Sequence, residues 1–489
     1  MNRGLVAIVA AMATMAAAGA DEPVKAPNPA PRRVGRGVLA GRIGADNITL
    51  RLPNVIGDNM VLQRNVPLPI WGWAAPGQQV RVALAGGAAE TTADEKGEWM
   101  VTLPAMPAGG PHQMTVAAPR VPTITVKNIL VGEVWFSSGQ SNMDVGVAGA
   151  QGGAEAVAAA DWPDVRLFQA PHVARATPAS DVAAEWRPCS PTSVPNFSAI
   201  AYYFGRELHK ELKIPIGLIN CSWGSTTVQQ WTPPEGYDLV PEFASGKLKR
   251  ERCPIGKDGC GGMYNAMIAP VVPFAIRGAL WYQGEDNIHR EGPIYDKLLQ
   301  ALILGWRDVW GQGEFSVYYV QLAPFAGTRG ALPAMWEAQT RAMAIPKTGM
   351  AVISDLVTDL NDIHPANKLD VGKRLAGWAL AKDYGRKDLV YSGPTFKGMT
   401  VEGNKALVSF DHTGGGLASR DNKDLTSFQV AGEDKKFLPA TARIVGEKVE
   451  VFAEGVKPVA VRFAYDGTAR PNLMNKEGLP ANSFRTDGW

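Results

Sequence analysis

Three short polar motifs carry side chains that together could cleave an ester. The first is Ser138-Gly-Gln-Ser-Asn-Met143, which directly follows an apolar segment. A Ser on a tight turn between a strand and a helix presents its hydroxyl and its own backbone N–H to the same point, as a nucleophile with an oxyanion donor requires. Ser141 is therefore the candidate nucleophile. The motif differs from a Gly-x-Ser-x-Gly turn, because Met143 stands where the second Gly would be.

The second motif is Trp281-Tyr-Gln-Gly-Glu-Asp-Asn287, again after an apolar segment. An Asn on such a loop can donate its amide N–H to a developing oxyanion, a contribution of about 3–4 kcal/mol in known cases. Asn287 is thus a candidate oxyanion donor. The alternative is that Asn287 only caps a helix, which is a common use of Asn.

The third motif is Asp359-Leu-Asn-Asp-Ile-His-Pro365, which contains the candidate base. Of the six His residues, only His289 and His364 fall near candidate active-site loops; the others are His112, His172, His209 and His412. His364 has carboxylates close before it and a Pro after it that restricts the turn. A base oriented by a carboxylate is the arrangement of a catalytic triad, so His364 is the expected general base.

Apolar segments that alternate with helical segments predict how these motifs are positioned. The expected strands are 129–136, 214–220, 275–281, 315–322 and 350–353, and the expected helices are 200–212, 295–306 and 335–344. This alternation predicts an α/β fold with a parallel sheet and helices on both faces. In such sheets the site lies at the carboxyl ends of the strands, where the three motifs would meet.

Short alternating strands flank this region on both sides and predict further β structure. We expect an N-terminal β-sandwich domain over 48–127, a catalytic domain over 128–388 and a C-terminal β-rich region over 389–489. The C-terminal region could be a separate domain or could pack back against the first sandwich.

The first twenty residues predict an export signal. A basic Arg3 precedes an apolar run, and Ala18-Gly-Ala20 fits a cleavage site before a Pro-rich linker over 21–47. The run is shorter than the roughly 20 residues of a membrane span, which disfavours an uncleaved anchor. We therefore expect a secreted or periplasmic protein with no membrane span in the mature chain.

Composition excludes some function classes. The chain has 489 residues and a formal net charge of +2, without the clustered Lys and Arg that nucleic-acid binding requires. The sequence contains no paired Cys-x-x-Cys motif of the kind that binds zinc, so no metal is expected. The four cysteines allow three disulfide pairings, and Cys253 and Cys260 flank a turn-rich segment that could close a small loop.

The motifs, in this order, resemble the SGNH-hydrolase superfamily and, within it, the sialate O-acetylesterase family. The matching segments are Asp58–Arg64, Trp71–Gly77, Gly132–Trp135, Gly139–Met143, Trp281–Glu285, Asp362–Pro365, Gly478–Pro480 and Phe484–Asp487. The resemblance implies a three-layer α/β/α fold and a serine esterase that removes acetyl groups from a sugar without a cofactor.

The resemblance also implies a role for individual residues. Ser141 would be the nucleophile and His364 the base, while Gly224 would add a second backbone N–H to the oxyanion hole. Asn287 would supply the side-chain donor, although it stands one place later than in the usual Gly-x-Asn-Asp spacing. An Asp usually stands three places before the His, but here that residue is Asn361. Asp362 is the expected orienting acid, and a Ser–His dyad held by a backbone carbonyl is the alternative.

Five further residues are predicted to bind substrate. Gln140, Asn265, Gln283 and Glu285 would line the pocket, and Trp231 would offer a face on which a sugar could stack; alternatively, Asn265, Gln283 and Trp231 only pack the loops. Glu285 and Asp286 could also suggest the two carboxylates of a glycosidase. Neighbours in sequence normally point apart, however, which disfavours that possibility.

Three alternatives to a sialate esterase remain. The same groups could deacetylate xylan or another polysaccharide, since the motifs do not distinguish acetylated sugars. A non-catalytic carbohydrate-binding protein would not need the Ser, Asn and His motifs together. A lipase is disfavoured, because the sequence has no long apolar lid. The oligomeric state is left open.

Overall fold

Seven neighbouring strands form the central part of the largest sheet, and their order determines which strand ends lie side by side. The computed structural model describes residues 50–249 and 259–489, so the predicted export signal over 1–20, the predicted linker over 21–47 and Cys253 lie outside the described residues. Within the described residues the strands are ordered β13 (Thr348–Ala351), β12 (Ser316–Val320), β11 (Gly278–Tyr282), β7 (Ile124–Gly139), β10 (Ile216–Ser222), β8 (Trp162–Gln169) and β9 (Trp186–Cys189).

Every neighbouring pair from β13 to β8 is parallel, and only the edge strand β9 runs antiparallel. In register, Gly139 at the end of β7 faces Ser222 on β10 and Tyr282 on β11. The three strands therefore release their following loops side by side at one edge of the sheet, as a parallel arrangement requires.

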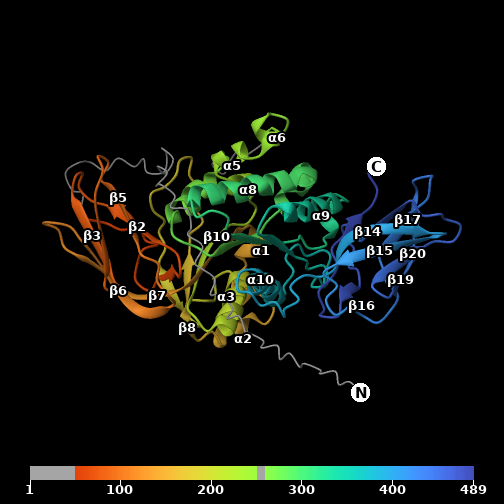
Figure 1. Ribbon diagram of the computed structural model, residues 1–489, viewed down its shortest axis with the longest axis horizontal. Helices are drawn as coiled ribbons and strands as arrows, with labels where there is room; N and C mark the ends of the chain where they lie inside the picture. Colours follow the sequence, from red (N-terminus) through yellow and green to blue (C-terminus); the bar gives the residue numbers. More distant parts are fainter. Residues whose placement is uncertain (1–49, 250–258) are drawn as a thin grey trace, which may run out of the picture. The chain divides into compact units, whose positions relative to one another are not determined.

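Helices cover both faces of this sheet (Figure 1). Successive aromatic residues of β7 point to opposite faces, as in any strand. Trp135 packs edge-on against Phe204 of α3, and Phe136 packs edge-on against Trp306 of α8. The helices are α1 (Ser141–Asp144), α2 (Gly153–Ala158), α3 (Ala199–Leu212), α4 (Val228–Trp231), α5 (Pro234–Asp238), α6 (Pro241–Ala244), α7 (Ile288–Glu291), α8 (Tyr295–Trp310), α9 (Leu332–Arg341) and α10 (Lys368–Lys382).

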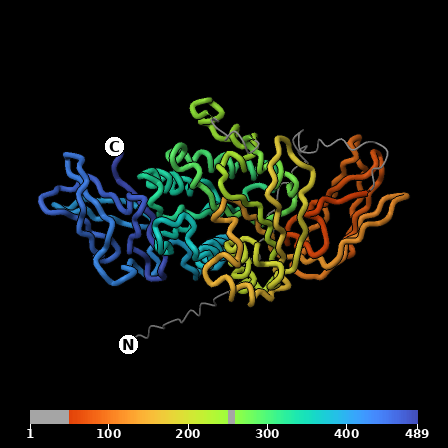
Figure 2. Tube along the Cα trace, turned by 180° about the vertical axis from the view of Figure 1, so that it is seen from behind, coloured from red at the N-terminus to blue at the C-terminus, as the bar shows by residue number. Residues whose placement is uncertain are grey.

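The first half of β7 belongs to a second group of strands, which Figure 2 shows in red to orange. Antiparallel β6 and parallel β1 pair with β7 before it enters the central sheet, while β2 pairs with β5. These strands are β1 (Val61–Gln63), β2 (Leu68–Trp73), β3 (Gln79–Leu84), β4 (Gly87–Thr92), β5 (Glu98–Leu103) and β6 (Gly109–Ala117). Their buried side chains join those of the central sheet in one hydrophobic core.

The C-terminal region consists of short antiparallel strands around a hydrophobic core of its own. The strands are β14 (Thr395–Glu402), β15 (Lys405–Asp411), β16 (Leu417–Ser419), β17 (Phe428–Ala431), β18 (Phe437–Pro439), β19 (Thr441–Val445), β20 (Lys448–Phe452), β21 (Ala460–Phe463), β22 (Leu473–Asn475) and β23 (Phe484–Arg485). Arg485 of β23 donates to Glu337 of α9, which connects this region to the helices of the central sheet.

The structure confirms the predicted fold class of a parallel sheet between helices with β structure at both ends. All five predicted strands of the central sheet and all three predicted helices are present, with ends that differ by a few residues. The sequence analysis missed β8, β9 and α10. The domain boundaries at 127/128 and 388/389 stay predictions, and β7 runs across the first of them.

Two further observations bear on the predicted chain features. Cys260 is disulfide-bonded, whereas Cys189 and Cys221 are buried free thiols. Among residues 50–249 and 259–489, no helix has the length and apolar character needed to cross a membrane.

A buried ion cluster ties β7 to its neighbours. Glu133 of β7 is fully buried and accepts hydrogen bonds from Arg64, Gln63 and Arg277. Burial alone would raise the pKa of Glu133, but the hydrogen bonds and charges of Arg277, Arg64 and Gln63 outweigh it and hold this pKa below its ordinary value. The cluster therefore stabilises the fold only while Glu133 is ionised.

We expect Glu133→Gln to lower the free energy of unfolding by about 2–3 kcal/mol at pH 7, because charged hydrogen bonds are lost while two Arg side chains stay partly buried. The measurement is urea unfolding. Because the folded-state pKa is depressed, the difference from wild type should shrink as the pH falls through the folded pKa of Glu133. Glu90→Gln breaks the exposed pair with Arg81 and should cost less than about 1 kcal/mol. Equal losses in the two variants would contradict this account.

Candidate active site

The loops after β7, β10 and β11 are held together by backbone hydrogen bonds at the carboxyl edge of the sheet. Gln140 N–H donates to the carbonyl of Tyr282, and Trp223 N–H donates to the carbonyl of Gly139, both at 3.0 Å. Gly139 has φ 143°, and a Cβ at this position would lie 2.1 Å from the Tyr282 oxygen. Only glycine allows this approach, so the turn that carries Ser141 depends on Gly139.

Ser141 and His364 form a hydrogen bond although 223 positions separate them. Ser141 is the first residue of α1, directly after the end of β7, while His364 lies in the loop after β13. His364 Nε2 lies 2.8 Å from Ser141 Oγ. A neutral imidazole with its proton on Nδ1 accepts the hydroxyl proton through Nε2, which is the geometry of a nucleophile and its general base.

Asp362 lies near His364 but does not bond to its ring. Asp362 Oδ1 accepts the backbone N–H of His364 at 2.8 Å and lies 4.0 Å from Nδ1. Burial lowers the pKa of His364 below its ordinary value of 6.5, the Lys368 cation lowers it further, and Asp362 opposes both. In this state Asp362 acts on the imidazole through its charge and through the loop backbone.

Two backbone N–H groups are available next to Ser141 for an oxyanion. A Cβ on Gly224 would lie 3.3 Å from Ser141 Cβ, so the loop after β10 runs directly beside the nucleophile. No hydrogen bond to another described residue engages the N–H of Ser141 or of Gly224. Both groups were predicted donors, and the structure brings them together.

Asn287, the predicted side-chain donor, is buried behind this point. Asn287 Nδ2 donates to Gln229 Oε1 at 2.9 Å and lies 3.4 Å from Glu291 Oε2, while its oxygen accepts from Gln283 and from the N–H of Val228. In this structure the amide N–H groups of Asn287 are thus directed to Gln229 and Glu291, and its role as an oxyanion donor stays a prediction.

Gln140 and Gln283, two of the predicted substrate-binding residues, link loops in the interior. Gln283 Nε2 lies within hydrogen-bond distance of Gln140 Oε1 and the Thr226 carbonyl, at 3.0 and 2.9 Å. Gln140 Nε2 in turn donates to Asp286 Oδ2 at 3.0 Å. Both glutamines are buried. Their contacts hold the loops after β7, β10 and β11 in one arrangement.

The remaining predicted substrate-binding residues are also engaged by the protein. Trp231 is fully buried and donates to Thr226 Oγ1, so its ring offers no face to a sugar. Asn265 is buried and donates to the carbonyl of Arg175. Glu285 accepts from Asn142 Nδ2 at 2.6 Å. In this structure all three side chains contact neighbouring loops, and a role of Asn265 or Glu285 in substrate binding stays a prediction.

Sequence analysis missed a pair of aromatic rings beside the nucleophile. His172 stacks on Trp223, the residue before Gly224, with ring centroids 5.1 Å apart and planes 7° from parallel. His172 Nε2 lies 3.1 Å from Asp144 of α1, and that same carboxylate oxygen accepts from Ser222. His172 is exposed and Trp223 is partly exposed. Recognising β8 would have revealed this pair, since His172 follows the carboxyl end of that strand.

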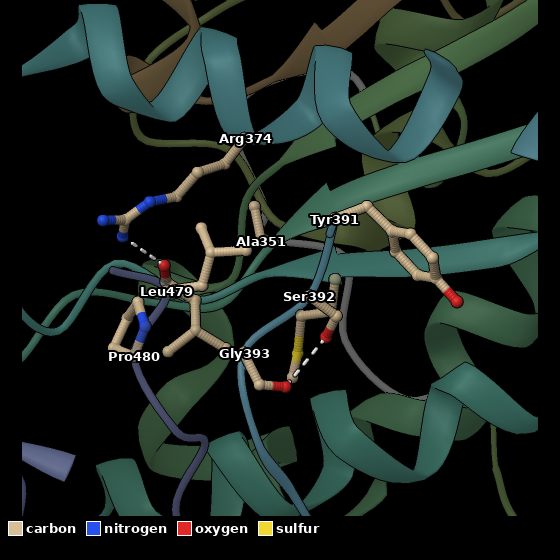
Figure 3. Close-up of a pocket in the computed structure, with 9 residues that line it drawn as sticks. Ala351, Arg374, Tyr391, Ser392, Gly393, Leu479 and Pro480 are labelled. Atoms are coloured by element: carbon tan, nitrogen blue, oxygen red, sulfur yellow. Dashed lines mark hydrogen bonds between the residues drawn. The ribbon is translucent and has the colours of Figure 1, made fainter. Parts of the chain in front are cut away.

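A separate small pocket lies away from these groups (Figure 3). Arg374, Ala351 and the segments 391–393 and 479–480 contribute to its lining. The Arg374 guanidinium is already bound by the Asp355 carboxylate at 2.6 and 2.7 Å. Across the part of the chain that the structure describes, no three His, Cys, Asp or Glu side chains gather as metal ligands would.

Comparison with known proteins gives consistent results. Residues 131–381 match the family described as carbohydrate esterase, sialic acid-specific acetylesterase. The human sialate O-acetylesterase is 28% identical over 464 residues, with 87% of this chain and 88% of the relative covered. The rat sialate O-acetylesterase is 30% identical, with 80% and 84% covered. A carbohydrate acetylesterase of Xanthomonas citri, known from a crystal structure, is 36% identical with a TM-score of 0.83, covering 90% of this chain and all of that one.

We expect Asp362→Asn to lower kcat about tenfold. A charge 4 Å from a half-exposed imidazolium contributes about 1–2 kcal/mol, much less than a bonded triad acid, whose loss costs about 10⁴-fold. Because Asp362 raises the pKa of His364, the acid limb of the pH–rate profile should move to lower pH in this variant.

The control for this prediction is Asp359→Asn, which neutralises the carboxylate that bonds to Asn361 instead. It should leave kcat within about twofold of wild type. A 10⁴-fold loss in Asp362→Asn would mean that the carboxylate bonds to Nδ1 during the reaction, and an unchanged kcat would exclude any catalytic contribution.

Proposed function

The chain belongs to the sialic acid-specific acetylesterase family of carbohydrate esterases, and we propose that it is a secreted serine esterase that hydrolyses O-acetyl groups on sugars. Its membership in this family makes it an esterase. The observation that carries the serine mechanism is the 2.8 Å contact between Ser141 Oγ and His364 Nε2.

In the proposed mechanism, His364 takes the hydroxyl proton of Ser141 as Oγ attacks the acetyl carbonyl carbon. The carbonyl oxygen becomes an oxyanion, which accepts hydrogen bonds from the N–H groups of Ser141 and Gly224. The sugar hydroxyl leaves with the proton from His364. Water, activated by the same His, then attacks the acetyl-enzyme and releases acetate.

Secretion is part of the proposal and rests on the first twenty residues. Their basic start, apolar run and small-residue cleavage site are typical of an export signal. An oxidising compartment also suits a protein in which Cys260 is disulfide-bonded.

The substrate that we propose first is an O-acetylated sialic acid, because the human and rat relatives bear that name. Acetylated xylan is the second candidate, since the Xanthomonas citri relative is described only as a carbohydrate acetylesterase. The sugar ring is proposed to lie on the stacked pair of Trp223 and His172, whose position beside Gly224 and Ser141 would present an acetyl group to the nucleophile.

Ser141→Ala should abolish acetate release, because it removes the hydroxyl that lies 2.8 Å from His364 Nε2 and that would attack the ester. Wild type and variant are assayed on O-acetylated sialic acid, acetylated xylan and 4-nitrophenyl acetate, with kcat expected to fall by at least about 10³-fold in the variant. The sugar with the higher wild-type kcat/KM identifies the substrate class.

Retained activity in folded Ser141→Ala would overturn the serine mechanism. A folded wild type that is inactive on every ester but binds the sugars would instead support the non-catalytic binding protein.

Trp223→Ala should lower kcat/KM about tenfold on an acetylated sugar and leave ethyl acetate unaffected, since only the sugar has a ring to stack. Aromatic stacking contributes about 0.5–1.5 kcal/mol beyond buried area. Trp489→Ala removes another exposed Trp, one that packs near Phe437 in the C-terminal region, and serves as the control. An equal loss on both esters in Trp223→Ala would indicate distortion of the Ser141 loop rather than a lost sugar contact.

A further inference from the structure

A buried ammonium group lies behind the candidate site and is not used by the proposed mechanism. Lys368 is the first residue of α10 and is only 1% exposed. Its Nζ donates to Asn142 Oδ1 at 2.5 Å and lies 5.7 Å from the centre of the Tyr282 ring. Burying a cation is costly, so a Lys in this position needs a compensating partner.

Asn142 supplies the connection between this cation and the catalytic loops. Its Oδ1 accepts from Lys368, and its Nδ2 donates to Glu285 Oε1 at 2.6 Å and to the Ile363 carbonyl at 3.0 Å. The opposite amide orientation would place the –NH₂ group against the ammonium, so the cation determines which way the amide points. One side chain thus uses its amide oxygen and both of its N–H donors on three different segments.

These contacts join the two reacting residues through their nearest chain neighbours. Asn142 follows Ser141, Ile363 precedes His364, and Glu285 lies in the loop after β11. Asn142 is 1% exposed, and Glu285 Oε2 is buried and has no hydrogen-bond partner among residues 50–249 and 259–489. The distance between the turn of Ser141 and the loop of His364 is therefore set in a nearly dry interior, where hydrogen bonds are strong.

We propose that Lys368, Asn142 and Glu285 are positioning residues that hold the turn of Ser141 against the loop of His364, with the buried ammonium as the anchor. None of the three touches the reacting atoms. The inference rests on the proposed Ser–His mechanism and adds to it the groups that maintain the 2.8 Å contact.

The charged groups around Lys368, Asn142 and Glu285 also change the pKa of His364, the proposed base. Burial lowers the pKa of Lys368 to about 8 and raises that of Glu285 to about 7. The titratable and charged groups that face this region are Lys368 of α10, Asp362 of the His364 loop, Glu285 and Asp286 after β11, and Tyr282 of β11. Lys368 lowers the pKa of His364, so removing its charge should raise that pKa, which a purely structural contact would not do.

Two substitutions separate geometry from charge. Lys368→Gln keeps an N–H donor for Asn142 but removes the cation, so the plateau kcat should stay within about threefold of wild type while the acid limb of kcat/KM moves to higher pH. Lys368→Met removes the donor as well, and misplacement of Ser141 relative to His364 should lower kcat about 10–100-fold with little change in KM. Both are measured as acetate release from 4-nitrophenyl acetate across pH.

Lys373→Gln is the matched control, since it removes one exposed positive charge from the same helix and should leave the plateau and the acid limb unchanged. Circular dichroism and thermal unfolding establish that each variant is folded, and Lys368→Gln decides alone if Lys368→Met does not fold. Ser141→Ala is assayed in parallel, because its residual activity tests the serine mechanism independently.

The inference would be overturned if Lys368→Gln kept the wild-type acid limb and plateau and Lys368→Met kept the wild-type kcat. An inactive Ser141→Ala in the same experiment would show that the proposed function still holds. An acid limb that moves to higher pH in Lys368→Gln but not in Lys373→Gln supports it.

Discussion

The close approach of two strand ends is the constraint on which the site depends. Gly139 ends β7 so near the carbonyl of Tyr282 that no side chain fits between them. This contact allows Gln140 to bond across to β11 and starts α1 at Ser141. A larger residue at this position would separate the loops, and Ser141 would lose both its orientation and its relation to Gly224.

Around this junction, buried polar side chains hold the loops together through hydrogen bonds, whereas hydrophobic packing holds the rest of the fold together. Gln140 and Gln283 connect the loops after three strands, and Asn142 connects the Ser141 turn to the His364 loop. A buried amide without partners is costly, so satisfied networks of this kind favour one loop arrangement over others. In the proposed mechanism the two N–H donors are thus oriented before substrate arrives, and such preorganised donors are how an oxyanion hole accelerates a reaction.

Strand β7 links the site to the stability of the fold. β7 pairs with two groups of strands, and Glu133 near its middle is held by Arg64, directly after β1, and by Arg277, directly before β11. The motif around Glu133 therefore has a structural role, whereas the motif that begins a few residues later contains the proposed nucleophile Ser141. The two are continuous along one strand, so a change that shifts β7 at Glu133 also shifts Ser141.

The sequence by itself determined five strands and three helices around the central sheet, the fold class and the pairing of Ser141 with His364. Those features follow from local patterns: apolar runs mark the strands, and a parallel sheet brings the loops after them to one edge. The strand β8 was missed because Pro163, Asp164 and Arg166 interrupt its apolar pattern. The position of His172 after the end of this strand was therefore missed as well.

Only the tertiary structure decided how individual side chains are used. The amide of Asn287 bonds to Gln229, Trp231 is buried, and Lys368 reaches Asn142 across 226 positions. Each outcome depends on rotamers and on partners distant in sequence, which no local spacing contains. Sequence patterns specify which backbone segments meet, whereas the packing of the meeting segments specifies which polar atoms remain available for substrate.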